Sequence, residues 1–113
     1  MPEVIKLKEL VTYQDQAIVS KTLVEKETGT VTLFAFDKDQ ALSEHTAPFD
    51  ALVQVIDGRA EIRIAGAPHL VGEGEMVVMP ANQSHALKAL TPFKMLLTMI
   101  RAKDKQKKPK PKA

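Results

Sequence analysis

The sequence predicts the all-β class, as one small antiparallel barrel or a pair of packed sheets. Short runs rich in β-branched residues recur every 8–12 residues and are separated by Gly, Pro, Asn and Asp turn signals. The 113 residues suffice for one core, and 44% hydrophobic with 27% charged residues is typical of a globular domain. Tryptophan is absent and there is one tyrosine, so the core is expected to be aliphatic and filled by Val, Leu, Ile and Met.

The first half contains the clearest strand signals. Residues 17–25 and 30–36 are expected to form a hairpin around the Thr28-Gly29 turn, followed by a polar loop at residues 37–40. A short amphipathic helix is expected before them, at residues 7–13.

Residues 51–56 and 59–64 flank Asp57-Gly58, a dipeptide typical of two-residue hairpins. We therefore expect these two runs to pair with each other. In the second run Arg59, Glu61 and Arg63 alternate with apolar residues, which predicts one wet face and one buried face.

Later strands are expected at residues 69–71, 75–79, 84–90 and 93–100. Pro80 ends the second of these, because proline cannot donate to a central ladder. These runs complete a fold whose strands are all short.

Charge divides the chain into a body and a tail. Residues 101–113 carry seven basic residues and one acid, a net charge of +6, so the body carries −4. We expect a single domain over residues 1–101 and a disordered Lys/Pro-rich tail over residues 102–113. A solvated tail is the simpler interpretation, and weak contact with a nucleic acid or an anionic surface is the alternative. The acidic body argues against specific nucleic-acid binding.

Several classes of protein are excluded. The chain has no cysteine, which removes disulfides, thiolate nucleophiles and cysteine-based zinc sites. No apolar run approaches the ~18 residues of a membrane span, and the N-terminus does not resemble a secretory signal, so a cytoplasmic protein is expected. The usual motifs of serine hydrolases, P-loop proteins, dinucleotide-binding proteins and zinc peptidases are missing.

The candidate functional residues are histidines. His45 and His85 each lie at the edge of an expected strand near a loop, where barrel mouths place functional side chains. His69 follows Pro68 on a short strand and is expected to be structural. Met79, Met95 and Met99 are expected to fill the core, with a methionine-assisted copper site as the alternative.

Two motifs around these histidines resemble those of the cupin family. The first cupin motif is roughly H-x-H, three or four residues, E, six residues, G. His45 and Gly58 match its first and last positions, whereas Ala47 stands at the second histidine and Ala51 at the glutamate. Residues 29–100 carry the resemblance.

The second cupin motif is roughly G, five residues, P-x-G, two residues, H, three residues, N. Gly74, Pro80 and His85 match it. Asn82 replaces the inner glycine, a mild change because asparagine tolerates the left-handed conformation, and Ala89 replaces the final asparagine.

The resemblance implies a double-stranded β-helix, or jelly-roll, whose interior holds a divalent metal on three histidines and one glutamate. It also implies a homodimer. Here it leaves His45 and His85 as a two-histidine metal site, with any divalent transition metal (Ni, Zn, Mn, Fe or Cu) bound weakly or not at all. Ala47 and Ala51 share the strand parity of His45 and are expected to face the same interior. Asp50 would replace the missing acid only if a bulge turned it inward.

Three functions follow from this pattern. The first is a small-molecule-binding barrel with a degenerate two-histidine site. The second is a metal-dependent enzyme, a dioxygenase or isomerase, in which non-protein ligands complete the site. The third is a structural or interaction module. The missing ligands favour the first, and the sequence does not decide whether the chain is an enzyme.

Overall fold

The computed structural model describes residues 3–102, and within them the regular secondary structure is strand apart from one short 3-10 turn. The strands are β1 (Ile18–Lys26), β2 (Gly29–Phe36), β3 (Ala41–His45), β4 (Phe49–Asp57), β5 (Arg59–Ile64), β6 (Ala67–Gly72), β7 (Met76–Met79), β8 (His85–Ala89) and β9 (Phe93–Arg101). The expected amphipathic helix is only a 3-10 turn, at Leu7–Glu9. In the described part, no helix has the length and apolar character needed to cross a membrane.

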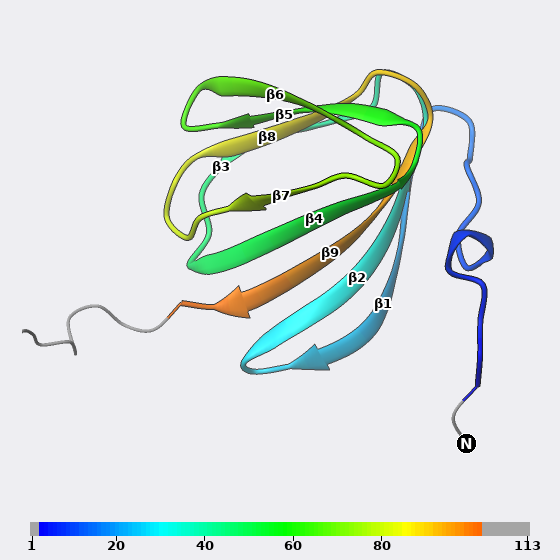
Figure 1. Ribbon diagram of the computed structural model, residues 1–113, viewed down its shortest axis with the longest axis horizontal. Coiled ribbons are helices and arrows are strands. Elements are labelled where there is room, and N and C mark those ends of the chain that lie inside the picture. The colour runs from blue at the N-terminus through cyan, green and yellow to red at the C-terminus, as the bar shows by residue number, and fades with distance from the viewer. Residues whose placement is uncertain (1–2, 103–113) are drawn as a thin grey trace, which may run out of the picture.

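Two antiparallel sheets face each other (Figure 1). One has the strand order β1-β2-β9-β4-β7 and the other the order β3-β8-β5-β6. Consecutive strands repeatedly change sheet, which is the connectivity of a jelly roll. The all-β jelly-roll prediction is therefore confirmed.

The expected hairpin at Asp57-Gly58 is wrong. Strand β4 pairs with β7 and β9, whereas β5 pairs with β6 and β8. Gly58 does adopt a positive φ of 76°, but the turn there carries the chain from one sheet to the other. A turn dipeptide determines only that the chain changes direction there. Which strands pair depends on which side chains must be buried in the core. The β1–β2 hairpin, in contrast, forms around Thr28 as expected.

The core lies between the sheets and is centred on Phe36 and Phe93. Their rings stack with centroids 4.6 Å apart, and both side chains are fully buried. The predicted alternation in β5 is confirmed: Ala60 and Ile62 are buried, whereas Arg59 is exposed. The expected aliphatic core is therefore wrong at its centre, and the other fully buried side chains of this core are aliphatic apart from methionine.

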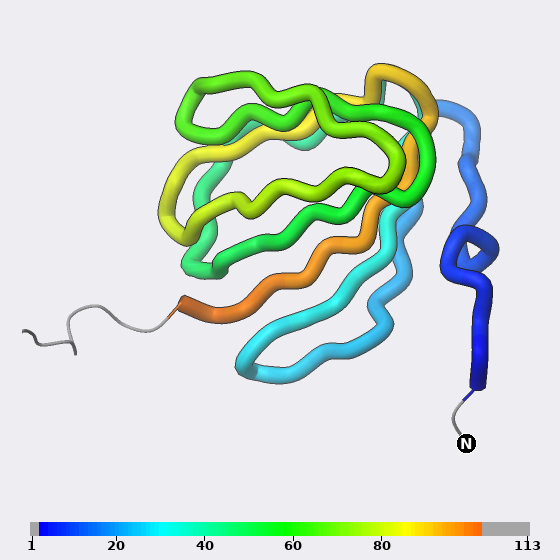
Figure 2. The backbone as a smooth tube through the Cα atoms, viewed as in Figure 1, coloured from blue at the N-terminus to red at the C-terminus, as the bar shows by residue number. Residues whose placement is uncertain are grey.

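A second, smaller cluster covers part of the outer face of the five-stranded sheet. Val11 packs there on Leu33 and Ala35, so the N-terminal segment lies against this sheet (Figure 2). The Tyr13 hydroxyl donates to the Asp57 carboxylate at 2.5 Å. Burial first, and then this carboxylate, raises the pKa of Tyr13 well above its usual range.

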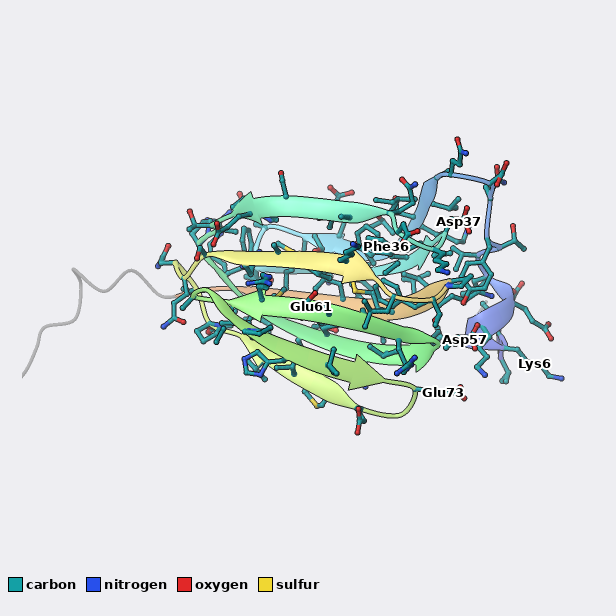
Figure 3. All side chains as sticks on the ribbon, turned by 90° about the horizontal axis from the view of Figure 1, so that it is seen from above. Lys6, Phe36, Asp37, Asp57, Glu61 and Glu73 are labelled. Carbon is teal, nitrogen blue, oxygen red and sulfur yellow. The ribbon has the colours of Figure 1, made fainter. Side chains whose placement is uncertain are left out.

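An ion pair adds to this attachment. The Lys8 ammonium lies 3.2 Å from the Glu73 carboxylate. Figure 3 shows Asp57 and Glu73 at the end of the molecule where Lys6 and the N-terminal segment lie. The N-terminal segment is therefore attached near one end of the barrel, and the two motif loops lie at the opposite end (Figure 1).

Candidate functional site

His45 is exposed, and it faces the cavity because of an irregularity in β3. Leu42 pairs with Leu87 and His45 pairs with His85, so three steps along β3 match two steps along β8. In a regular strand, residues three apart point to opposite faces. The extra residue in β3 cancels this, so that His45 points to the same face as Leu42. His45 and Leu42 consequently line the same cavity. Strand β3 was not predicted from the sequence, and nothing in the residue pattern reveals this irregularity.

His85 begins β8, directly after the loop that contains Pro80 and Asn82. Its side chain is buried, and its backbone pairs with Ile64 on one side and His45 on the other. Asn82 adopts φ 67°, so it takes the left-handed conformation expected of the residue in the glycine position. Its backbone N–H donates to the carbonyl of Ala47 at 2.8 Å, which ties the two motif loops together at one end of the barrel (Figure 1).

The two imidazoles meet, as the sequence predicts for residues 40 positions apart. Their Nε2 atoms lie 3.1 Å apart. Their ring centroids are separated by 4.4 Å at an interplanar angle of 73°. Both rings therefore direct the same nitrogen toward one point at the mouth of the cavity.

The other ring nitrogens fix the tautomers. His45 Nδ1 lies 2.8 Å from the Ser43 carbonyl, and His85 Nδ1 lies 3.3 Å from the Gln83 carbonyl. A carbonyl only accepts, so each Nδ1 carries the hydrogen and each neutral ring presents a bare Nε2 lone pair. Two lone pairs that face each other at this distance favour one shared proton or one cation between them.

The surroundings of His85 oppose its protonation. Burial, and after it the positive charge of His45, lowers the pKa of His85, and the Gln83 carbonyl offsets this only in part.

The unfolding free energy is expected to fall as the pH of the metal-free protein is lowered from 7.5 to 5.5. An unfolded histidine titrates near pH 6.5, whereas folded His85 resists protonation. The unfolded chain then binds more protons, and stability decreases with pH through this window. Urea unfolding across the range measures the slope. His85→Gln should reduce the slope and His69→Gln should not, and stability that rises on acidification would contradict this account.

An apolar cavity of about 60 Å³ lies beneath the two rings. Apart from the two histidines, all its lining side chains are apolar: Leu42, Ala47, Phe49, Ala51, Met79, Leu87, Met95, Leu97 and Met99. It has room for about four to six water molecules, or for a small organic ligand.

Both alanines at the missing-ligand positions line this cavity, so the prediction that they face inward is confirmed. The reason given by strand parity is incomplete. His45 ends β3 in one sheet and Ala51 belongs to β4 in the other, so no single strand carries them.

Other sequence candidates lie elsewhere. His69 is exposed on the edge strand β6 and lines a separate shallow depression. Asp50 is also exposed, and its carboxylate accepts from the Ala81 N–H at 2.9 Å. Asp50 is therefore not a displaced cavity ligand.

The four-ligand divalent site implied by the motifs does not fit these residues. Ala47 and Ala51 supply no donor. Within residues 3–102, no three His, Cys, Asp or Glu side chains converge to hold an ion. Two imidazoles alone fall short of the three or more protein ligands that divalent zinc usually has.

A protein-family model described as the cupin domain matches residues 32–100. The chain belongs to the cupin family. Similarity to solved structures agrees with this. A conserved protein of unknown function from Streptococcus pyogenes is 36% identical with a TM-score of 0.87, over 91% of this chain and 90% of that one.

Two further cupins share the fold. A cupin 2 conserved barrel domain protein from Leptotrichia buccalis is 43% identical with a TM-score of 0.84, over 86% of this cupin and 47% of that chain. A cupin superfamily protein from Desulfitobacterium hafniense is 22% identical with a TM-score of 0.84, over 89% and 93% of the two chains. No curated protein sequence matches this cupin.

Proposed function

We propose that this cupin is a small-molecule-binding domain whose ligand occupies the apolar cavity and is held at its polar end by His45 and His85. The observation that carries this proposal is the pair of Nε2 atoms 3.1 Å apart at the mouth of an otherwise apolar cavity. Pockets of this kind bind the ligand body by apolar contact and orient it with a few polar groups.

The chemistry of the pair favours a weakly acidic ligand. An acid supplies the one proton that the two facing lone pairs lack, and its anion then pairs with the resulting imidazolium. The apolar walls, among them Leu42 and Leu87, favour a short hydrocarbon body. We therefore propose a short-chain organic acid as the class of ligand, with the two histidines serving as its anchor rather than as a complete metal site.

Butyrate is expected to bind with a Kd on the order of 1 mM, about −4 kcal/mol, because only a few apolar atoms are buried. The experiment is an amide NMR titration of the full chain at pH 6, with butanol as the matched neutral ligand. Resonances of Leu42 and Leu87 should shift with butyrate and much less with butanol.

Matched variants test the anchor. His85→Gln should weaken butyrate binding at least tenfold, whereas His69→Gln, in a separate depression, should leave it unchanged. Equal binding of butanol and butyrate, or shifts confined to surface lysines, would overturn the proposal. The expected homodimer and cytoplasmic location stay predictions, and the proposed tail at residues 102–113 lies almost wholly outside the described residues.

A further inference from the structure

Two methionines flank the position from which the metal-binding carboxylate is missing. In the five-stranded sheet Ala51 pairs with Met99 on β9 and with Met79 on β7. Directly opposed residues of antiparallel strands project to the same face, with Cβ atoms about 4.5–5.5 Å apart. Both methionines line the cavity beside the two histidines.

Ala51 contributes only a methyl group, so it leaves space between the long thioether side chains of Met79 and Met99. Met79 is buried and Met99 is partly buried. Met95 is four residues farther along β9, about 13 Å from Met99 at the strand rise, so it belongs to the inner end of the cavity. The outer row therefore combines two thioether sulfurs with the two imidazole nitrogens opposite.

We propose that this cavity is a soft-metal site that takes a monovalent cation, Cu(I), on His45, His85, Met79 and Met99. The proposal rests on the same cavity as the proposed function and names a second occupant of it. All four donors are uncharged, and the cavity lining contains no carboxylate. A divalent ion would be buried there with no opposing charge, which is unfavourable, whereas a single charge costs much less.

Donor softness points the same way. Thioether sulfur selects Cu(I) over the harder divalent ions, and imidazole is compatible with copper. The histidine geometry also fits: an Nε2–Nε2 distance of 3.1 Å corresponds to an N–metal–N angle of about 100° for bonds of 2.0–2.1 Å. That angle is close to the tetrahedral value and suits two neighbouring ligands of one ion.

The first experiment measures affinity. The full chain is titrated with Cu(I) under anaerobic conditions against a chromogenic Cu(I) chelator, and with Zn(II) and Ni(II) in parallel. We expect one equivalent of Cu(I) to bind more tightly than either divalent ion. The double variant Met79→Leu with Met99→Leu keeps the apolar volume, and its Cu(I) affinity should fall at least tenfold. Met76→Leu, an exposed methionine on the same strand as Met79, is the matched control and should change nothing.

The second experiment needs no variant. Protein with 13C-labelled methionine methyl groups is titrated with Ag(I), an air-stable monovalent substitute. The Met79 and Met99 methyl signals should shift together at one equivalent, while that of Met76 stays in place.

A Cu(I) affinity in the double variant within twofold of the parent, or tighter binding of Zn(II) than of Cu(I), would overturn the inference. So would Ag(I) binding that leaves the methionine methyl signals unmoved. If butyrate still binds through His85 in that case, only the metal assignment falls. If the methionine-dependent Cu(I) site holds but butyrate does not bind, only the organic-acid proposal falls.

Discussion

The paired substitution Ala47→His with Ala51→Glu is expected to give this cupin a tight divalent-metal site. Both alanines line the cavity with His45 and His85, so the new side chains would complete a set of three histidines and one carboxylate. At a metal concentration 100 times the Kd, binding stabilises the folded state by about 2.7 kcal/mol. For a domain of this size that corresponds to a rise in Tm of about 10 °C or more.

The metal-free double variant should be less stable than the parent. Ala51 is buried between Met79 and Met99, and overpacking at such a position costs about 1–3 kcal/mol. The buried carboxylate adds a desolvation penalty until an ion offsets it. Addition of Zn(II) or Ni(II) should therefore restore and then exceed the stability of the parent.

The measurement is the Tm of parent and variant, determined by thermal unfolding with and without metal. Ala47→His with Ala51→Gln is the matched control, because the amide has the shape of the carboxylate without its charge, and its metal response should be much smaller. An equal rise in Tm for the parent would mean that its divalent site is already complete. No rise in either would mean that the new side chains do not reach the histidines.

Gly58→Ala is expected to be strongly destabilising. Gly58 has φ 76°, and a Cβ placed there would lie 2.0 Å from the Pro92 carbonyl oxygen. The left-handed conformation alone costs roughly 1–2 kcal/mol for a residue with a Cβ. The backbone clash is added to that, because neither the turn nor the adjoining start of β9 can yield without disturbing Phe93 in the core.

Gly66→Ala is the matched control. Gly66 has a similar φ of 84°, but a Cβ there meets no atom within 4 Å. Gly66→Ala should therefore lose only the free energy that the left-handed conformation costs. The unfolding free energy of Gly58→Ala, measured in urea, should be well below that of Gly66→Ala. Equal losses would show that the turn between the sheets tolerates the added methyl, and that the close approach to Pro92 is not needed.

The site could be predicted only in part. Motif spacing located His45 and His85 as convergent residues, because the spacing encodes strand lengths and turns that a cupin backbone requires. It did not reveal the extra residue in β3 that turns His45 inward, since β3 is polar and lacks a clear strand pattern. The methionine pair was also hidden, because Met79 and Met99 are neighbours only across β4.

The sequence by itself determined the all-β class and most strand positions, because these depend on local periodicity, which can be read directly from residues. The paired histidines and the two missing ligands were implied by the resemblance of the two motifs to those of cupins. Only the tertiary structure decided that β4 and β5 part at Gly58 into different sheets, and that Met79, Ala51 and Met99 form one row. Strand partners are chosen by burial over the whole molecule, and contacts between distant segments leave no periodic signal in the sequence.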